Sequence, residues 1–275
     1  MRQGGSQTAL MVAAFRGRAS RLPNPVCHDP WADALAGEDG ARIADAYGSF
    51  NPHATLWMAV RTGFLDRIVQ ETHADQIVIL GAGLDTRAAR LARSGVRFFE
   101  VDHPQTQATK RARLAQLENY PIDAATFVPC DFETDDPLDR LTAEGLDPAR
   151  PVLVLWEGVV HYLTEEAIQT TLRRITSGLH PDSVLVFDTV SKVVAQNRSR
   201  REMDQELAKL VEEVGEPMLF GLDDAVPLMH RCGFQHVRTV SFDEACLSLT
   251  GTYERKRAFR FQHFVLGSAG RPFPH

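Results

Sequence analysis

The spacing of apolar residues changes near residue 75. Before that point the apolar residues follow helical spacing that four prolines interrupt, and no segment has the pattern of a strand. From Gln76 onward, short apolar runs alternate with amphipathic stretches, which is the pattern of a strand followed by a turn and a helix. Repeated units of this kind wind a parallel sheet. The chain is therefore expected to have a helical cap over residues 1–75 and a sheet from residue 76.

The predicted strands are short apolar runs bounded by turn residues. They are expected at 76–80, 96–101, 126–128, 152–156, 184–188, 234–242 and 259–266. Helical spacing predicts helices at 85–93, 105–118, 164–179, 193–214 and 223–232. The last two strands suit an antiparallel pair, and the charged amphipathic helix at 193–214 is expected over the open end of the sheet. The sequence thus predicts an α/β, Rossmann-like fold with a mostly parallel seven-stranded sheet.

Composition narrows the class of partner and the compartment. The formal net charge of -6 at pH 7 argues against nucleic acid as the main partner, because nucleic-acid binding relies on basic side chains. No apolar run approaches the roughly 18 residues that a membrane span needs, so no membrane partner is expected. Arginines after residues 9–15 argue against a secretion signal. Four scattered cysteines without C-x-x-C spacing favour a reducing cytoplasm and argue against zinc or disulfides.

A glycine turn follows the first predicted strand. The strand ends at Leu80, and Gly81, Ala82 and Gly83 lead into the next helix. Glycines let backbone approach a ligand closely, and the N–H groups at a helix start form a polar cradle. Such turns bind dinucleotides, nucleotides and S-adenosylmethionine alike. A dinucleotide fingerprint has a third glycine where this chain has Thr86, which weakens the interpretation as a dehydrogenase.

Three further predicted strands end in acidic residues, namely Asp102, Asp131 and Glu157. Ligands of open α/β sheets bind beyond the carboxyl ends of the strands. Asp102 could accept hydrogen bonds from ribose hydroxyls, or it could only cap the next helix. Asp131 beside Phe132 could bind an adenine amino group, or it could belong to a solvated acidic loop. The set of strand ends, which includes Glu157-Gly158, is more specific than any single member and predicts a nucleotide-like site.

At this point the chain resembles a known family, the S-adenosylmethionine-dependent methyltransferases related to leucine carboxyl methyltransferase. The family includes bacterial O-methyltransferases of secondary metabolism. The likeness is carried by residues 13–16, 29–32, 61–62, 80–87, 100–102, 131 and 156–163. It implies a class I methyltransferase fold, S-adenosyl-L-methionine as cofactor and no metal. From the length and the patterns along the chain we expect a single methyltransferase domain over 1–275, divided into a cap (1–75), a cofactor-binding sheet (76–190), a helical insert over the active site (191–232) and C-terminal strands with a tail (233–275).

The resemblance also implies roles for single residues. Arg61 would pair with the methionine carboxylate of the cofactor, because a guanidinium fork suits a planar anion. Gly81 and Gly83 would permit close approach, and Asp102 would hold the ribose. Asp131 with Phe132 would flank the adenine, and Glu157 would lie near the amino or sulfonium end. The expected cofactor site also includes Ala82, Asp85, His103 and Gly158, with the alternative that Asp85 and Arg87 brace the loop by hydrogen bonding.

Two residues after Glu157-Gly158 are candidates for catalysis. His161 and Tyr162 follow this strand end, on the side where a methyl acceptor would lie. An ordinary imidazole titrates near pH 6.5, so His161 is a candidate base for a hydroxyl acceptor, whereas a carboxylate acceptor is already ionised. The alternative is that His161 fills space or caps the next helix.

These observations predict an S-adenosylmethionine-dependent O-methyltransferase. We expect a small-molecule acceptor with a carboxyl or hydroxyl group, in secondary metabolism. Two alternatives stay open, an NAD-dependent dehydrogenase and a non-catalytic S-adenosylmethionine-binding regulatory protein. A protein carboxyl terminus as acceptor also stays open. The sequence does not indicate the oligomeric state or the atom that receives the methyl group.

Overall fold

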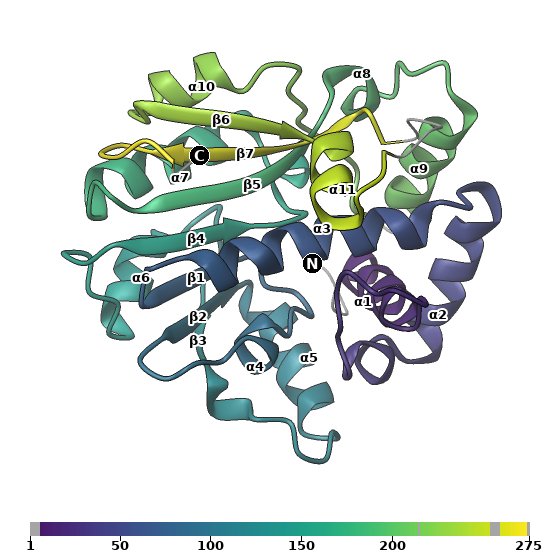
Figure 1. The fold of residues 1–275 in the computed structure, drawn as a ribbon, viewed down its shortest axis with the longest axis horizontal. Coiled ribbons are helices and arrows are strands. Elements are labelled where there is room, and N and C mark those ends of the chain that lie inside the picture. The colour runs from purple at the N-terminus through teal and green to yellow at the C-terminus, as the bar shows by residue number, and fades with distance from the viewer. Residues whose placement is uncertain (1–5, 214, 254–258, 274–275) are drawn as a thin grey trace.

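A seven-stranded sheet forms the centre of the chain in a computed structural model, which describes residues 6–213, 215–253 and 259–273 (Figure 1). The strand order is β3-β2-β1-β4-β5-β7-β6, with β7 antiparallel to both of its neighbours and the other pairs parallel. The strands are β1 (Gln76–Leu80), β2 (Arg97–Asp102), β3 (Ala125–Pro129), β4 (Val152–Trp156), β5 (Val184–Val190), β6 (His236–Ser241) and β7 (Gln262–Ser268). The predicted Rossmann-like sheet with an antiparallel C-terminal pair is confirmed.

Helices cover both faces of this sheet. They are α1 (Gln7–Ser20), α2 (Ala32–Phe50), α3 (Ala54–Glu71), α4 (Arg87–Arg90), α5 (Pro104–Leu114), α6 (Pro137–Ala143), α7 (Glu165–Gly178), α8 (Lys192–Ala195), α9 (Glu202–Glu213), α10 (Val226–Arg231) and α11 (Phe242–Thr250). Two short 3-10 turns are η1 (Ile122–Ala124) and η2 (Val160–Tyr162). None of the described helices combines the length and apolar character needed to cross a bilayer.

Several sequence predictions were wrong in their boundaries, and three of them have a clear local cause. The helix expected at 85–93 is only α4, because Asp85 and Thr86 keep non-helical turn geometry before it. The helix expected at 193–214 is divided into α8 and α9, and Asn197 between them has a φ of 50°. The strand expected to reach Phe242 stops at Ser241, because Ser241 and Glu244 form a capping box that starts α11.

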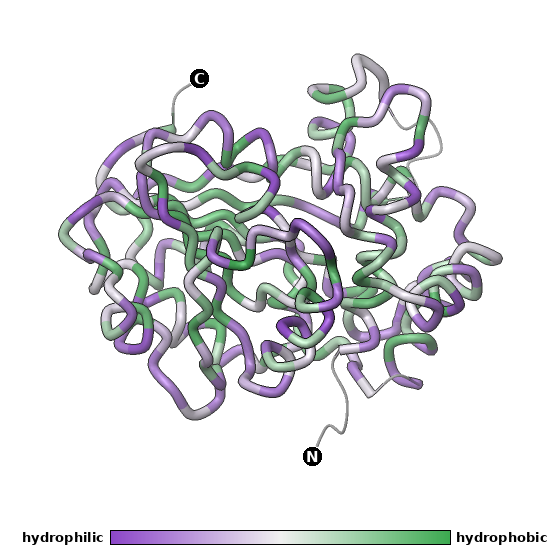
Figure 2. The backbone as a smooth tube through the Cα atoms, turned by 90° about the horizontal axis from the view of Figure 1, so that it is seen from below, coloured by the Kyte–Doolittle hydropathy of each residue, from purple (hydrophilic) through white to green (hydrophobic). Residues whose placement is uncertain are grey.

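The sheet separates the hydrophobic core into two layers, one on each face. Along β1, Ile77 and Ile79 contact the layer that contains α1, α2 and α3, while Val78 and Leu80 contact the opposite layer. Strand β4 alternates in the same way, so both central strands are buried on both faces. The colouring by hydropathy agrees, because hydrophobic segments of the backbone concentrate in the interior of the molecule and hydrophilic segments lie toward its outside (Figure 2).

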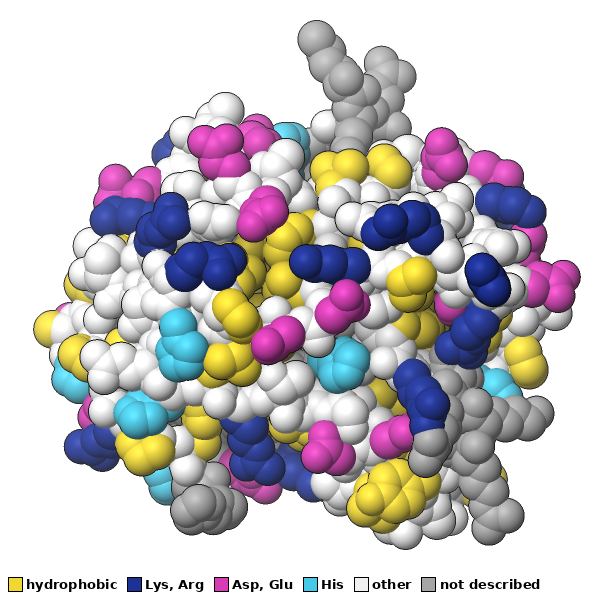
Figure 3. All heavy atoms as spheres, turned by 90° about the horizontal axis from the view of Figure 1, so that it is seen from above, with side chains coloured by type: hydrophobic (Ala, Val, Ile, Leu, Met, Phe, Trp, Pro, Cys, Tyr) yellow, Lys and Arg dark blue, Asp and Glu magenta, His cyan; other side chains and the backbone are white. Residues whose placement is uncertain are grey.

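The ends of the central strands determine where a site can form. The carboxyl ends of β1, β2 and β4 point toward α1 and α9, which lie beyond the edge of the sheet (Figure 1). The chain order reverses between β1 and β4, which places the topological switch point of the sheet at the same edge. By contrast, the face in Figure 3 carries interspersed basic and acidic side chains with single apolar ones between them, as a solvated surface does.

Candidate functional site

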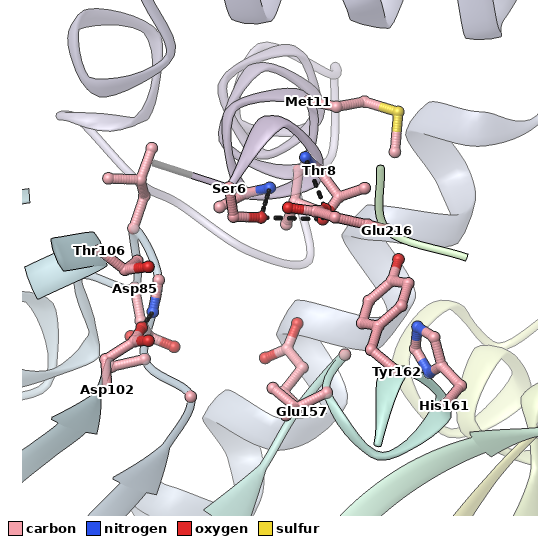
Figure 4. A pocket seen from close by; sticks show the side chains of 18 of the residues that line it. Ser6, Thr8, Met11, Asp85, Asp102, Thr106, Glu157, His161, Tyr162 and Glu216 are labelled. Atoms are coloured by element: carbon pink, nitrogen blue, oxygen red, sulfur yellow. Dashed lines mark hydrogen bonds between the residues drawn. The ribbon is translucent and has the colours of Figure 1, made fainter. Parts of the chain in front are cut away.

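A cavity of about 680 Å³ lies beyond the carboxyl ends of the central strands (Figure 4). Its walls come from the strand ends, from the start of α1 and from α9 with the segment that follows it. All the residues predicted for the site line this one cavity. They are Arg61, Gly81, Ala82, Gly83, Asp85, Asp102, His103, Asp131, Phe132, Glu157, Gly158, His161 and Tyr162. The predicted positions are therefore brought together from five separate segments of the chain.

The glycine turn has a conformation that other residues adopt poorly. Gly81 has a φ of 63°, and a Cβ at this position would overlap Cγ2 of Val159. The Gly83 N–H donates to Oδ2 of Asp102 (2.5 Å), and Oδ1 of Asp102 accepts from the His103 N–H (2.7 Å). Burial raises the pKa of Asp102. The turn at the end of β1 is thus joined directly to the acid at the end of β2.

Asp85 stabilises the glycine turn through contacts with Arg87 and Lys110. Its Oδ1 accepts from the Arg87 N–H (2.6 Å), and its carboxylate forms an ion pair with the Arg87 guanidinium. Its backbone oxygen accepts from Nζ of Lys110, which also pairs with the buried Glu100. Burial alone would raise the pKa of Asp85, but Arg87 and other cations lower it to about 2. The Asp85 carboxylate is therefore ionised near pH 7 and forms an ion pair with Arg87.

Glu157 joins two arginines beneath the cavity. Its Oε1 accepts from Nε of Arg61 (2.8 Å), and its Oε2 lies 2.6 Å from Nη1 of Arg87. Burial opposes ionisation of Glu157, but Arg87 and then Arg61 lower its pKa below the ordinary value. Arg87 also bonds Asp66 through Nε (2.7 Å). Arg61, expected to pair with a ligand carboxylate, is thus already bonded to Glu157.

The ends of β2 and β3 form the more open side of the cavity. Oδ1 of Asp131 accepts from the Glu133 N–H (3.1 Å), and its Oδ2 lies 3.9 Å from Nε2 of His103. The ring of Phe132 lies 6.3 Å from that of Trp156. Asp131 and Phe132 are both half-buried, so a flat ligand group has access to the carboxylate and the ring together.

Sequence reasoning missed a buried acid near the end of β5. Asp188 is fully buried and accepts from the Gly158 N–H (2.6 Å) and from Nε2 of Gln262 (2.7 Å). Oε1 of Gln262 in turn accepts from the indole N–H of Trp57, and both of these side chains line the cavity. Asp188 lies inside β5, two residues before its end, but it was the last residue of the strand expected at 184–188, so the pattern of predicted strand ends could have identified it.

We call the part of the lining that lies beyond Glu157 from the glycine turn the far end. It consists of Thr8, Met11, His161, Tyr162 and Glu216 (Figure 4), together with Met218, which lines the cavity two residues after Glu216. Apolar side chains of β5 and α9 line the cavity as well, namely Val190, Leu207 and Val211.

His161 and Tyr162 stand together at the far end. Their ring centroids are 4.2 Å apart, and the backbone oxygen of His161 accepts from the Leu219 N–H (2.7 Å). Within the described residues, Nδ1 of His161 is buried and has no hydrogen-bond partner. Burial lowers the pKa of His161 to about 4 and raises that of Tyr162. Both side chains are therefore neutral near pH 7.

Thr8 and Glu216 were not predicted for the site. The hydroxyl of Thr8 donates to Oε2 of Glu216, and the Thr8 N–H points to the same oxygen (3.3 Å). The hydroxyls of Ser6 and Thr8 are 3.0 Å apart. Glu216 is only 5% exposed. These residues are separated by 208 positions in the chain, so no local motif indicates that they meet.

Comparisons with known proteins agree with this geometry. Residues 9–176 match the family described as leucine carboxyl methyltransferase. A protein of Mycolicibacterium smegmatis assigned as an S-adenosyl-L-methionine-dependent methyltransferase is 37% identical over 210 residues, which is 70% of each chain. A protein of Mycobacteroides abscessus with the same assignment is 34% identical over 222 residues, 73% of this chain and 72% of that one.

Solved structures support the fold alone. A DUF574 family protein from Streptomyces avermitilis has a TM-score of 0.65 and 17% identity, with 95% of this chain and 96% of that chain covered. A protein from Thermobifida fusca assigned as a methyltransferase has a TM-score of 0.63 and 18% identity, with 97% and 96% covered.

Proposed function

Because the chain belongs to the leucine carboxyl methyltransferase family and is an S-adenosyl-L-methionine-dependent methyltransferase, we propose that it methylates a carboxyl or hydroxyl oxygen of a small molecule. The acceptor would bind at the far end of the cavity and the cofactor at the strand ends. The resemblance to bacterial O-methyltransferases supports a place in secondary metabolism.

The lining of the cavity fits the cofactor in shape and charge. Glycine at position 81 lets the turn after β1 lie close to Val159, because a Cβ there would overlap that side chain. Among the described residues, the charged lining comprises Arg16, Arg61, Asp85, Asp102, Asp131, Glu133, Glu157 and Glu216. Acids therefore outnumber bases, which suits a cationic ligand. When bound, S-adenosylmethionine supplies an electrophilic methyl group on a sulfonium.

The strand-end residues would hold the two halves of this cofactor. Asp102 would accept hydrogen bonds from the ribose, sharing the carboxylate with the Gly83 N–H. Asp131 and Phe132 would bind the adenine at the open side. Glu157 would place its negative charge near the amino or sulfonium group while it holds Arg61 in position. Gly81, Ala82, Gly158 and His103 would contribute backbone and ring surface around them.

The remaining task of the protein is to align the acceptor oxygen with the methyl carbon. Positioning of this kind accounts for a large part of the rate of displacement reactions. His161 would take part as a neutral imidazole whose Nδ1 is free within the described residues, and Tyr162 would pack beside it. Because the pKa of His161 is about 4, its imidazole is a weaker base than an ordinary histidine. We therefore assign it a hydrogen bond to the acceptor rather than strong proton abstraction.

The observation that carries this proposal is the continuity of the cavity, in which the strand ends and the residues of α1 and α9 line one space. Ligand pockets commonly enclose roughly 300–1,000 Å³, so this volume suits small ligands. Asp102 lines the part of the cavity proposed for the cofactor, and Tyr162 lines the far end proposed for the acceptor.

Calorimetry with S-adenosylhomocysteine and NAD tests the cofactor, and a screen of small hydroxyl and carboxyl compounds tests the acceptor. We expect S-adenosylhomocysteine to bind, NAD not to bind, and S-adenosylhomocysteine to form with at least one compound. Asp102→Asn should weaken S-adenosylhomocysteine about tenfold through the lost charge-assisted bond, whereas the exposed control Asp123→Asn should not. Binding of NAD alone, or binding without any methyl acceptor in the screen, would contradict the proposal.

A further inference from the structure

A buried carboxylate faces the far end of the cavity. Glu216 is 5% exposed, and its Oε2 receives both hydrogen bonds from Thr8. Within the part of the chain that the structure describes, no hydrogen bond reaches its Oε1. Because Glu216 lines the cavity and its Oε1 is not sealed from it, a ligand that donates a hydrogen bond can reach this oxygen. The segment after α9 thus presents an oxygen atom to whatever occupies the far end.

The charges around the far end do not favour an anion. The described arginines that line the cavity are Arg16 and Arg61, and each already has an acidic partner. Nε of Arg16 bonds Asp29 (3.0 Å), and Nε of Arg61 bonds Glu157 (2.8 Å). His161 is neutral near pH 7, because burial lowers its pKa to about 4. A carboxylate at the far end would therefore lie near the acidic Glu216, while the Arg61 guanidinium, whose charge reaches His161 and Tyr162, is already paired with Glu157.

The rest of the far end is apolar or neutral. Met11 and Met218 offer flexible apolar surface, and Tyr162 adds an aromatic ring. Figure 4 shows Met11 and Glu216 on the same side of the cavity, with Tyr162 opposite them. An acceptor with an apolar body and one donor group matches this lining.

We propose that Glu216 determines specificity by accepting a hydrogen bond from an ammonium or hydroxyl group of the acceptor and by rejecting carboxylates. This inference rests on the proposed function and narrows the methylated atom to a hydroxyl oxygen. In the transfer, a bond forms between that oxygen and the methyl carbon. The bond from the methyl carbon to sulfur breaks and leaves its electron pair on sulfur, and the hydroxyl proton passes to water.

Three phenols that differ in one substituent test this inference. They are 4-(2-aminoethyl)phenol, 4-propylphenol and 3-(4-hydroxyphenyl)propanoate, titrated calorimetrically into the full chain saturated with S-adenosylhomocysteine. The ammonium compound should bind about tenfold or more tightly than the carboxylate, since hydrogen bonds to charged groups contribute at this level. Glu216→Gln should reduce this preference to within about threefold, because it keeps the shape and removes the charge. Glu213→Gln, at the exposed end of α9, should keep the wild-type preference.

The outcomes separate the inference from the function on which it rests. Failure of the wild-type chain to bind S-adenosylhomocysteine, measured before any phenol is added, overturns the proposed function. If S-adenosylhomocysteine binds, the inference is overturned by equal or tighter binding of the carboxylate, by binding of none of the three, or by an unchanged preference in Glu216→Gln. Equal S-adenosylhomocysteine affinity of Glu216→Gln and wild type shows that the variant is folded, so a changed preference then supports the role of Glu216.

Discussion

Replacing Gly81 by alanine should destabilise the chain more than the same change at another glycine of similar backbone conformation. Gly81 has a φ of 63°, and a Cβ there would overlap Cγ2 of Val159 at the end of β4. Gly95 has a φ of 79°, but a Cβ there would have no neighbour within 4 Å. The pair therefore separates the cost of overlap from the cost of the left-handed conformation.

The expected difference follows from these two costs. A left-handed conformation costs a residue with a Cβ about 1–2 kcal/mol, and this applies to both variants. Forcing an extra carbon into a packed site costs about 1–3 kcal/mol, and this applies only to Gly81→Ala. We expect Gly95→Ala to lose about 1–2 kcal/mol and Gly81→Ala to lose about 2–5 kcal/mol of unfolding free energy.

Urea denaturation at pH 7 measures the stabilities, and calorimetry with S-adenosylhomocysteine measures binding. Gly81→Ala should also weaken S-adenosylhomocysteine by at least about tenfold, because the new methyl group displaces the turn that lines the cavity. Adding Val159→Ala removes both Cγ atoms from the overlap and should restore part of the stability. Equal stability losses for Gly81→Ala and Gly95→Ala, together with unchanged binding, would refute this reasoning.

Three further predictions concern buried charges. Glu157→Gln should lose about 3 kcal/mol of unfolding free energy in urea, since it leaves two buried arginines short of an anion. The pKa of His161 is lowered to about 4, so between pH 6.5 and 4 the unfolded chain binds a proton that the folded chain does not. Stability should therefore fall by about 3 kcal/mol from this group as pH drops through that window, and His161→Gln should remove this part of the slope. Burial raises the pKa of Glu100 to about 7, so its charge costs stability as pH rises from 4.5 to 7. Lys110→Met removes the cation that limits this cost, so the fall in stability should continue above pH 7.

Controls and contrary outcomes are available for each of these variants. Glu118→Gln changes an exposed carboxylate and should alter stability by less than about 0.5 kcal/mol, and an equally small effect of Glu157→Gln would contradict its role. Identical pH slopes for wild type and His161→Gln between pH 4 and 6.5 would show that His161 titrates normally. A cost of Lys110→Met that is the same at pH 5 and pH 9 would exclude its coupling to Glu100.

The strand-end half of the site could be predicted because its signals are local. Gly81 directly follows β1 and Asp102 is the last residue of β2, and parallel topology brings those ends together. The far end could not be predicted, because Thr8 and Glu216 meet through the packing of α1 against the segment after α9. Nothing in the residues next to Glu216 indicates that its side chain is buried.

The fold was also predictable only in part, because local apolar patterns predict the central strands but not every helix. Apolar runs predict β1 and β4 to the residue, since these strands are buried on both faces. The pattern did not predict α11, because it depends on a capping box of Ser241 and Glu244 that lies inside a run of strand-forming residues. Residues 259–261 were expected in the last strand, but β7 begins at Gln262.

The hydrogen bonds from Thr8 to Glu216 have a consequence for protein engineering. The glycine turn and the acids that accompany it lie at the ends of the strands, whereas the far end is formed by α1, by η2 and by the chain after α9. An exchange of α1 with a relative therefore transfers only part of the wall that faces the acceptor. Chimeras that seek a new substrate should therefore exchange residues 6–20 and 202–222 as one unit and leave the sheet unchanged.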